Sequence, residues 1–399
     1  MTPIITTQSD NRDRRHELLP AELLPLFNET FVESCDLIER FTVALTLQVL
    51  QRCDLEVKFA AGATLSEAMT HAQLKPEVAE PALRWMLRLL CAHDQADDDR
   101  RGDLTHYRLR NDRQRDDIPR LRELQAALDP TALPAYRIAE IAAEGYPEFL
   151  RGEKRGDELL FRAETFDAWP EYFSNHNPLY AINNRVAAAA VLHWQRGPIG
   201  RVLELGGGMG SAALALVAAL DSAQRSDTLS SYLFSELSPV FLRRGQRALT
   251  AALPSAASAL FRRLDIDLPL APQGIEKDSV DLVYAVNVLH VARDLDATLA
   301  QLYQVIAPGG WLVLGECVRP HRDSAVYTEF VFQLLDSFRA PVLDPIARPN
   351  AGFLCAQDWQ RLLLRHGFER AETYPDLHEL SVAYPAFVVG AIGAQRPSR

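Results

Sequence analysis

Two polar residues near the ends of apolar segments could together do acid–base chemistry. His290 follows the apolar run Val280–Asn287, and Glu316 closes the apolar run Trp311–Glu316. An imidazole titrates near neutral pH, so His290 could remove a proton from a nucleophile. A carboxylate beside it could fix the imidazole tautomer and stabilise the imidazolium that forms. We therefore expect a catalytic pair; a histidine that only caps a helix or fills the interior is the structural alternative.

A glycine loop lies upstream of this pair. The segment Arg201–Leu220, RVLELGGGMGSAALALVAAL, predicts a strand, a loop and a helix. Gly206, Gly208 and Gly210 allow positive φ angles and close approach of a ligand to the backbone. Glu204, two residues before the first glycine, would repel a pyrophosphate at the helix N-terminus, but it suits a ligand that carries a cationic amine. We expect these four residues to bind such a ligand.

Further polar residues follow the next strand-like segments. Glu236 lies about thirty residues beyond the loop, where a carboxylate could accept both ribose hydroxyls of an adenosine. Asp265 could accept the exocyclic amine of adenine, and the side chain of Ile266 could pack on the ring. Asn287 lies just past the end of the fourth strand and is assigned to the same cofactor site. Each acid alone could be a loop residue or a helix cap, but together behind a glycine loop they indicate an adenosine-containing cofactor.

The elements that must position these residues alternate between strands and helices, which predicts an α/β fold. We place an N-terminal domain at residues 1–168 and a catalytic domain at residues 169–399. The catalytic domain is expected to hold a seven-stranded sheet. Its predicted strands are Arg201–Leu205, Ser231–Ser235, Ala259–Leu264, Val280–Asn287, Trp311–Glu316, Glu369–Tyr374 and Ala386–Ala394.

The N-terminal domain is predicted to be mostly helical. Apolar spacing indicates helices over Leu18–Leu50 and Pro76–Leu90, with a short helix between them capped by Thr64 or Ser66. A polar turn, AHDQADDDRRGDL, and the strand-like run THYRLR follow, which gives the outline of a winged helix. The acidic stretch Asp97–Asp99 at the wing tip would be repelled by DNA. We therefore expect a lid or dimerisation module, a homodimer, and no nucleic-acid partner.

Composition excludes several classes of function. The 399 residues carry 53 Asp and Glu against 42 Lys and Arg, and a net charge of −11 disfavours binding to a phosphate backbone. No apolar run reaches membrane-spanning length, and the polar start MTPIITTQSDNRDRRHE lacks the apolar core of a signal peptide. We expect a cytoplasmic protein with a frayed polar tail and no membrane partner. The five scattered cysteines are expected to be free thiols, and no metal site is expected.

The motifs resemble those of a known family. The pattern E-x-G-x-G-x-G at the glycine loop resembles motif I of class I S-adenosylmethionine (SAM) methyltransferases. The stretch FRRLDIDLPLAPQGIEKDSVDLVYAVNVLHVARDLDATLAQLYQVIAPGGWLVLGE is similar to the C-methyltransferase domains of polyketide synthases. Those domains carry an L-D-I-E-type segment, then D-L-V-I-A-x-N-V-L-H-A-T, a P-G-G turn and a closing glutamate. YPEFLRGEKRGDELLF also resembles the segment that precedes the family's core.

The resemblance implies a Rossmann-like seven-stranded sheet with a helical, winged-helix-like N-terminal domain, and SAM as the cofactor. In that family a histidine–glutamate dyad deprotonates the α-carbon of a β-ketoacyl thioester on an acyl carrier protein. His290 and Glu316 fall on the two dyad positions. The resemblance therefore implies methyl transfer to an activated carbon in natural-product biosynthesis.

Departures from the family pattern leave the acceptor open. The loop reads GGGMG rather than G-A-G-T-G, and Val291 and Ala292 follow the histidine in place of Ala-Thr. DSFRAP, followed by ARPNAGF, replaces an aromatic pair in a region that helps to wall the family's acceptor pocket. No ketosynthase, acyltransferase or carrier motif is found, so we expect a free-standing enzyme that acts on a carrier-bound or free small molecule.

Two other readings stay open. A small-molecule O-methyltransferase with His290 as its base would share the two-domain layout. A non-enzymatic protein that uses the fold as a scaffold is the third reading, and it gives no physical reason to keep Glu204, Glu236, Asp265 and His290 together.

Overall fold

The structure is a computed structural model that describes residues 14–102, 104–113, 115–254 and 257–398. The polar tail predicted at the N-terminus falls largely on residues 1–13, outside the described residues. The chain forms two compact units, and each unit is made of segments that are separated in the sequence. The first unit comprises the residues up to Glu29, Phe173–Arg322 and Pro341–Arg399, and the second comprises Thr30–Tyr172 and Asp323–Ala340. The predicted domain boundary at residue 168 and the homodimer stay predictions.

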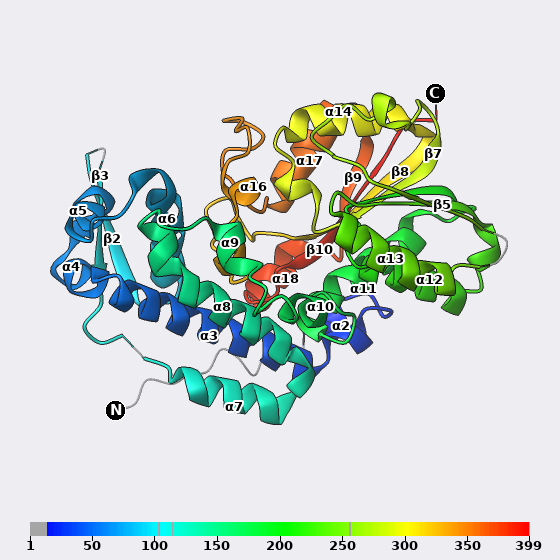
Figure 1. Cartoon of the computed structure of the whole chain (residues 1–399). Coiled ribbons are helices and arrows are strands. Elements are labelled where there is room, and N and C mark those ends of the chain that lie inside the picture. Colours follow the sequence, from blue (N-terminus) through cyan, green and yellow to red (C-terminus); the bar gives the residue numbers. More distant parts are fainter. Residues whose placement is uncertain (1–13, 103, 114, 255–256, 399) are drawn as a thin grey trace. The chain divides into compact units, whose positions relative to one another are not determined.

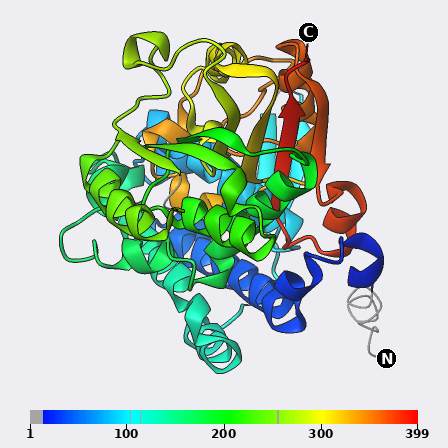
Figure 2. The same ribbon diagram turned by 90° about the vertical axis from the view of Figure 1, so that its right-hand side faces the viewer.

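The first unit is built on the predicted seven-stranded sheet (Figure 1). The strand order is β6-β5-β4-β7-β8-β10-β9, and only β10 runs antiparallel to its neighbours. In Figure 2 β10 is the red strand, next to the orange β9. The strands are β4 (Gly200–Leu205), β5 (Leu229–Ser235), β6 (Ser258–Arg262), β7 (Val280–Val286), β8 (Ile306–Cys317), β9 (Glu369–Tyr374) and β10 (Val389–Gln395).

Helices cover both faces of this sheet. In Figure 1 α12 and α13 lie together beside β5, whereas α14 and α17 lie on the other side of the strands. The central strands read as continuous apolar runs because parallel strands are buried on both faces. The helices of this unit are α2 (Arg15–Leu18), α11 (Pro178–Trp194), α12 (Ser211–Ser222), α13 (Pro239–Ala252), α14 (Leu295–Val305), α17 (Ala356–Arg365) and α18 (Leu377–Ala383). Short 3₁₀ turns are η1 (Leu24–Phe27), η3 (Ser226–Thr228), η4 (Ala271–Gln273) and η5 (Leu289–Val291).

Two glycines let α11 pack closely on the sheet. A Cβ added at Gly393 of β10 would lie 2.3 Å from the indole ring of Trp194. A Cβ at Gly315 of β8 would lie 2.7 Å from the Cβ of Ala187. Because these two glycines have no side chain, α11 packs closely on β8 and β10. This packing also holds the end of β8 that carries Glu316.

The second unit is mostly helical, as predicted, with one small sheet in the order β1-β3-β2. Thr64 forms a capping box with Glu67 at the start of the short helix α5, which confirms the predicted cap. The assignment of this region as a winged helix stays a prediction. The helices are α3 (Glu29–Arg52), α4 (Leu55–Ala61), α5 (Leu65–His71), α6 (Pro76–Ala92), α7 (Ile118–Leu128), α8 (Leu133–Leu150), α9 (Gly156–Leu160), α10 (Ala168–Tyr172), α15 (Glu329–Phe332) and α16 (Asp336–Arg339). The strands are β1 (Ala63–Thr64), β2 (Ala96–Arg101) and β3 (Leu104–Leu109), and the remaining 3₁₀ turn is η2 (Pro130–Ala132).

Two local predictions were wrong. The helix expected from Leu18 begins only at Glu29, because Pro20 and Pro25 lack the N–H groups that a continuous helix needs. The acidic stretch expected as a turn instead forms β2, in which Asp97 lies opposite Arg108 of β3. These opposite charges occupy facing positions of the hairpin, a pairing that residue type alone does not reveal.

No helix within the described residues is both long and apolar enough to cross a lipid bilayer.

Substituting Gly207 tests how tightly the glycine loop packs on the sheet. A Cβ at Gly207 would lie 2.3 Å from the ring of Phe234, which is fully buried in β5. We expect Gly207→Ala to destabilise the protein by about 1–3 kcal/mol through overpacking, and to lower the melting temperature. Gly197→Ala is the matched control, because an added Cβ there meets no atom within 4 Å. Equal melting temperatures for the two variants would contradict this packing.

Candidate active site

The predicted catalytic pair lies at the carboxyl ends of two adjacent parallel strands. β7 ends at Val286, which is in register with Gly315 of β8, and Glu316 follows at the next position. The chain then turns through Asn287, at a φ of 55°, into η5, which returns His290 to β8. Parallel strands present their carboxyl ends at one edge of a sheet, so residues far apart in sequence meet there.

The two side chains form a short, buried hydrogen bond. Nδ1 of His290 lies 2.6 Å from Oε2 of Glu316, and the backbone N–H of Leu289 donates to Oε1 over 3.1 Å. Both side chains are buried, and Glu316 has no exposed surface. A carboxylate oxygen beside Nδ1 favours the imidazole tautomer that carries its hydrogen on Nδ1. This is the arrangement that the predicted base and its orienting carboxylate require.

A second buried carboxyl group lies at the end of β4. Oε2 of Glu204 accepts a hydrogen bond from the hydroxyl of Tyr232 over 3.0 Å. Oε1 is buried without a hydrogen-bonding partner among the described residues. Burial raises the pKa of Glu204 to about 8, and the hydrogen bond from Tyr232 only partly opposes this. The group needs a further donor or cation, as the predicted cationic cofactor would provide.

The glycine loop after β4 has space on one side for a ligand. Gly208 has a φ of 56°, and an added Cβ would meet only the carbonyl oxygen of Gly206, at 4.0 Å. Gly210, with a φ of 89°, is the N-cap of α12 and packs against Gly245 of α13. The loop is therefore packed on its inner side and open at Gly208, which fits close approach of SAM to the backbone.

The carboxylate of Glu236, the residue after β5, is hydrogen-bonded to the glycine loop. Its Oε2 accepts the N–H of Gly208 over 3.0 Å, and its Oε1 accepts the N–H of Ser238 over 2.7 Å. Each carboxylate oxygen can accept a second hydrogen bond, so the group could still bind ribose hydroxyls. These contacts place Glu236 directly beside the glycine loop.

Asp265 and Ile266 follow β6, the outer strand of the parallel set. The side chain of Gln273 fixes Asp265, because it accepts the backbone N–H and donates to the carbonyl, both over 2.9 Å. Ile266 is half-buried. Their assignment to adenine binding stays a prediction.

Asn287 mainly joins the two strand ends. Its backbone N–H donates to Gly315 over 2.7 Å, and its side-chain oxygen accepts the N–H of Cys317 over 3.3 Å. Because the amide oxygen already bonds to β8, a cofactor contact of Asn287 stays a prediction.

Two residues of the site were missed from the sequence. Tyr232 lies inside a predicted strand, where an aromatic residue indicates only core packing. Phe353 packs on His290, with ring centroids 4.4 Å apart, but it comes from a loop with no periodicity. It is the last residue of ARPNAGF, whose departure from the pattern that the chain otherwise resembles was the available signal.

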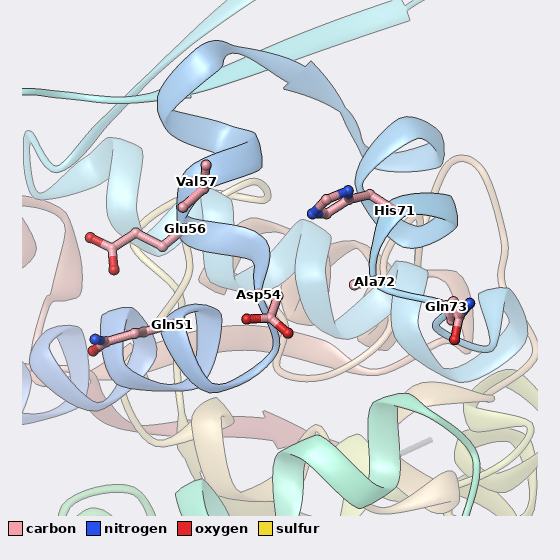
Figure 3. Close-up of a pocket in the computed structure, with 7 residues that line it drawn as sticks. All are labelled: Gln51, Asp54, Glu56, Val57, His71, Ala72 and Gln73. Carbon is pink, nitrogen blue, oxygen red and sulfur yellow. The ribbon is translucent and has the colours of Figure 1, made fainter.

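A separate hollow lies in the second unit (Figure 3). It has a volume of about 650 Å³, and its lining residues come from the end of α3, the following turn, α4 and the end of α5. Glu56 on its wall already forms ion pairs with Arg113 and Arg115. Polar lining residues include Gln51, Asp54, His71 and Gln73. Across the described residues, no three His, Cys, Asp or Glu side chains are grouped so that they could hold a metal ion.

Comparisons with known proteins agree with this fold. Residues 203–312 match the family described as "Methyltransferase domain". The highly reducing polyketide synthase valA of Aspergillus terreus is 30% identical over 258 residues, which are 63% of this chain and 10% of that protein. The chain thus spans about a tenth of the length of this curated relative.

Solved structures show the same fold over the whole chain. The CurJ carbon methyltransferase superposes with a TM-score of 0.76 at 20% identity, covering 98% of this chain and 99% of that one. The DszA carbon methyltransferase gives a TM-score of 0.72 at 21% identity, covering 100% of this chain and 98% of that one.

The raised pKa of Glu204 predicts that SAM affinity depends on pH. On the predicted assignment of Glu204 to the ammonium of SAM, the carboxyl group must lose its proton when SAM binds, so the affinity for SAM should rise between about pH 6 and about pH 8. The Glu204→Gln variant should bind SAM more weakly, and its affinity should not depend on pH in this range. The Glu369→Gln variant, changed at an exposed position, should keep the pH dependence of the wild type. Titration calorimetry measures both, and a flat profile for the wild-type protein would contradict the expectation.

The strand order, the glycine loop and the buried acid before it all belong to one architecture. The matched domain covers that loop and most of the parallel strands, and the structural neighbours extend the likeness to the whole chain. The chain therefore contains a SAM-dependent methyltransferase domain of the class I fold, related in sequence to segments of polyketide synthases.

Proposed function

We propose that this domain methylates an activated carbon of a polyketide-type acceptor, with His290 as the general base and Glu316 as the residue that orients it. The observation that carries the proposal is the 2.6 Å contact between Nδ1 of His290 and Oε2 of Glu316, buried at adjacent strand ends. An imidazole held in this way is a general base with a fixed tautomer and a fixed direction.

The chemistry requires a proton to leave the acceptor carbon. When bound, SAM supplies an electrophilic methyl group on a positively charged sulfur. The rest of the cofactor is the leaving group, a neutral thioether. Nε2 of His290 takes the proton from the acceptor carbon, and the electron pair of the broken C–H bond becomes available for the new C–C bond. The imidazolium is stabilised by the adjacent carboxylate until the proton leaves.

The comparisons support a carbon acceptor. Relatives in sequence are polyketide synthases, and structural neighbours are carbon methyltransferases. The methylene between the two carbonyl groups of a β-ketoacyl thioester is acidic enough for an imidazole base. We therefore propose such a thioester, free or on an acyl carrier protein, as the acceptor class.

A product analysis tests the proposal. The protein is incubated with methyl-labelled SAM and a β-ketoacyl N-acetylcysteamine thioester, and the position of the label is read by mass spectrometry and NMR. Label on the α-carbon is the expected result. A methyl ether or ester on a hydroxylated acceptor would instead favour an O-methyltransferase with the same base. Absence of transfer to every acceptor tried would favour a scaffold protein.

Replacing His290 should separate catalysis from cofactor binding. We expect His290→Gln to lower kcat by about 10²–10⁴-fold, because the base is lost, while the SAM dissociation constant stays unchanged. His378→Gln, at an exposed position of α18, is the control and should keep full turnover. Wild-type turnover in His290→Gln would refute the proposed role.

Replacing Glu316 tests the orienting role. In Glu316→Gln the side-chain amide can donate to Nδ1, which favours the tautomer with hydrogen on Nε2 and removes the lone pair from the acceptor side. We expect kcat to fall by about 10²-fold or more with SAM binding retained. Glu276→Gln, an exposed carboxylate of the same unit, should have no effect. Turnover equal to that of the wild type would show that His290 needs no orienting carboxylate.

A further inference from the structure

A buried arginine lies behind the catalytic pair. Arg348 is 2% exposed, and its guanidinium donates to the carbonyl oxygen of Ala292 over 2.8 Å and to that of His290. These two carbonyls lie within and at the end of η5, the turn that carries the imidazole. A single planar guanidinium therefore fixes the backbone of the residue whose side chain contacts Glu316.

Arg348 is itself held by a tight local structure. Its backbone exchanges two hydrogen bonds with Asp344, of 2.9 and 3.0 Å. The carboxylate of Asp344 accepts the N–H groups of Ile346 and Ala347, both over 2.8 Å, and pairs with Arg365 over 2.9 Å. These contacts hold the pKa of Asp344 at about 2, so the carboxylate stays ionised across the pH range of activity assays.

The same segment makes two more contacts with the base and its turn. The backbone N–H of Val342 donates to the carbonyl of Arg293 over 2.6 Å. The ring of Phe353 lies against the ring of His290. Residues 342–353 therefore contact η5 and the residues after it at several points, and Arg348 is the one that bonds to the backbone of His290.

The charge of Arg348 is costly where it lies. Its Nε is buried without a hydrogen-bonding partner among the described residues. Burial lowers the pKa of Arg348 to about 10, while the charge of Glu316 opposes this. An apolar side chain would avoid this cost, but it would leave the carbonyl oxygens of Ala292 and His290 without these donors.

We propose that Arg348 is a positioning residue for the dyad: it holds η5 so that Nδ1 of His290 stays on Glu316 and Nε2 faces the acceptor. The inference rests on the proposed role of His290 as base. It predicts that loss of the guanidinium disturbs the Nδ1–Oε2 contact and the rate of methyl transfer, but not the binding of SAM.

The experiment compares Arg348→Met, Arg348→Lys and the control Arg361→Met. Methionine removes both donors at similar length, and lysine keeps the charge and can donate to one carbonyl. Arg361 donates to the carbonyl of Ile346 in the same segment over 3.1 Å and pairs with Asp358 over 2.9 Å. Turnover is measured with the β-ketoacyl N-acetylcysteamine thioester, SAM binding by calorimetry, and folding by thermal melting.

We expect Arg348→Met to lose about 10²-fold in kcat, as misplacement of a catalytic group does, with the SAM dissociation constant unchanged. Arg348→Lys should recover part of the loss, and Arg361→Met should turn over like the wild type. The downfield proton resonance of the short Nδ1–H hydrogen bond should weaken or move in Arg348→Met and persist in Arg361→Met.

Wild-type kcat in a folded Arg348→Met variant would overturn the inference, as would an unchanged Nδ1–H resonance. If Arg348→Met does not fold, Arg348→Lys tests the inference instead. Wild-type kcat in Arg348→Lys would show that hydrogen bonds to both carbonyls are unnecessary and would overturn the inference. His290→Gln separates this inference from the proposed function. Full turnover in His290→Gln refutes the function itself, whereas an inactive His290→Gln beside a fully active Arg348→Met refutes only the role of Arg348.

Discussion

The structure of the site depends on one buried hydrogen bond, between the imidazole of His290 and the carboxylate of Glu316. A carboxylate without solvent contact is costly unless donors surround it. Here the imidazole N–H and the backbone N–H of Leu289 supply those donors. Parallel pairing of β7 with β8 puts both residues at the same edge of the sheet, so the sheet's register determines whether the bond can form.

Two buried carboxyl groups at this edge have different requirements. Glu316 is bonded through both oxygens, whereas Oε2 of Glu204 accepts from Tyr232 and its Oε1 has no partner among the described residues. Burial therefore raises the pKa of Glu204, and a cation beside it would restore the ionised form. Most of the residues predicted to bind the cofactor thus lie on one side of the sheet, and the predicted base lies at its middle strands.

The segment 341–355 has neither a helix nor a strand of its own, yet side chains hold it at many points. Arg322 donates to the carbonyl of Ile346 over 2.7 Å, and Arg319 donates to that of Ala351 over 3.0 Å. Arg348 bonds in the opposite direction, from the segment to η5. Backbone carbonyls that lack a ladder are satisfied here by guanidinium groups, which makes an irregular segment rigid enough to line a site.

The sequence by itself determined the layout of the sheet and the two ends of the site. Apolar strands interrupted by Glu204, the glycines and His290 are local patterns, and all seven predicted strands are found in the sheet, most within a few residues of their predicted bounds. Only the tertiary structure decided which side chains support these residues. Tyr232, Phe353 and Arg348 reach the site by burial and long-range packing, and neither spacing nor periodicity carries that information.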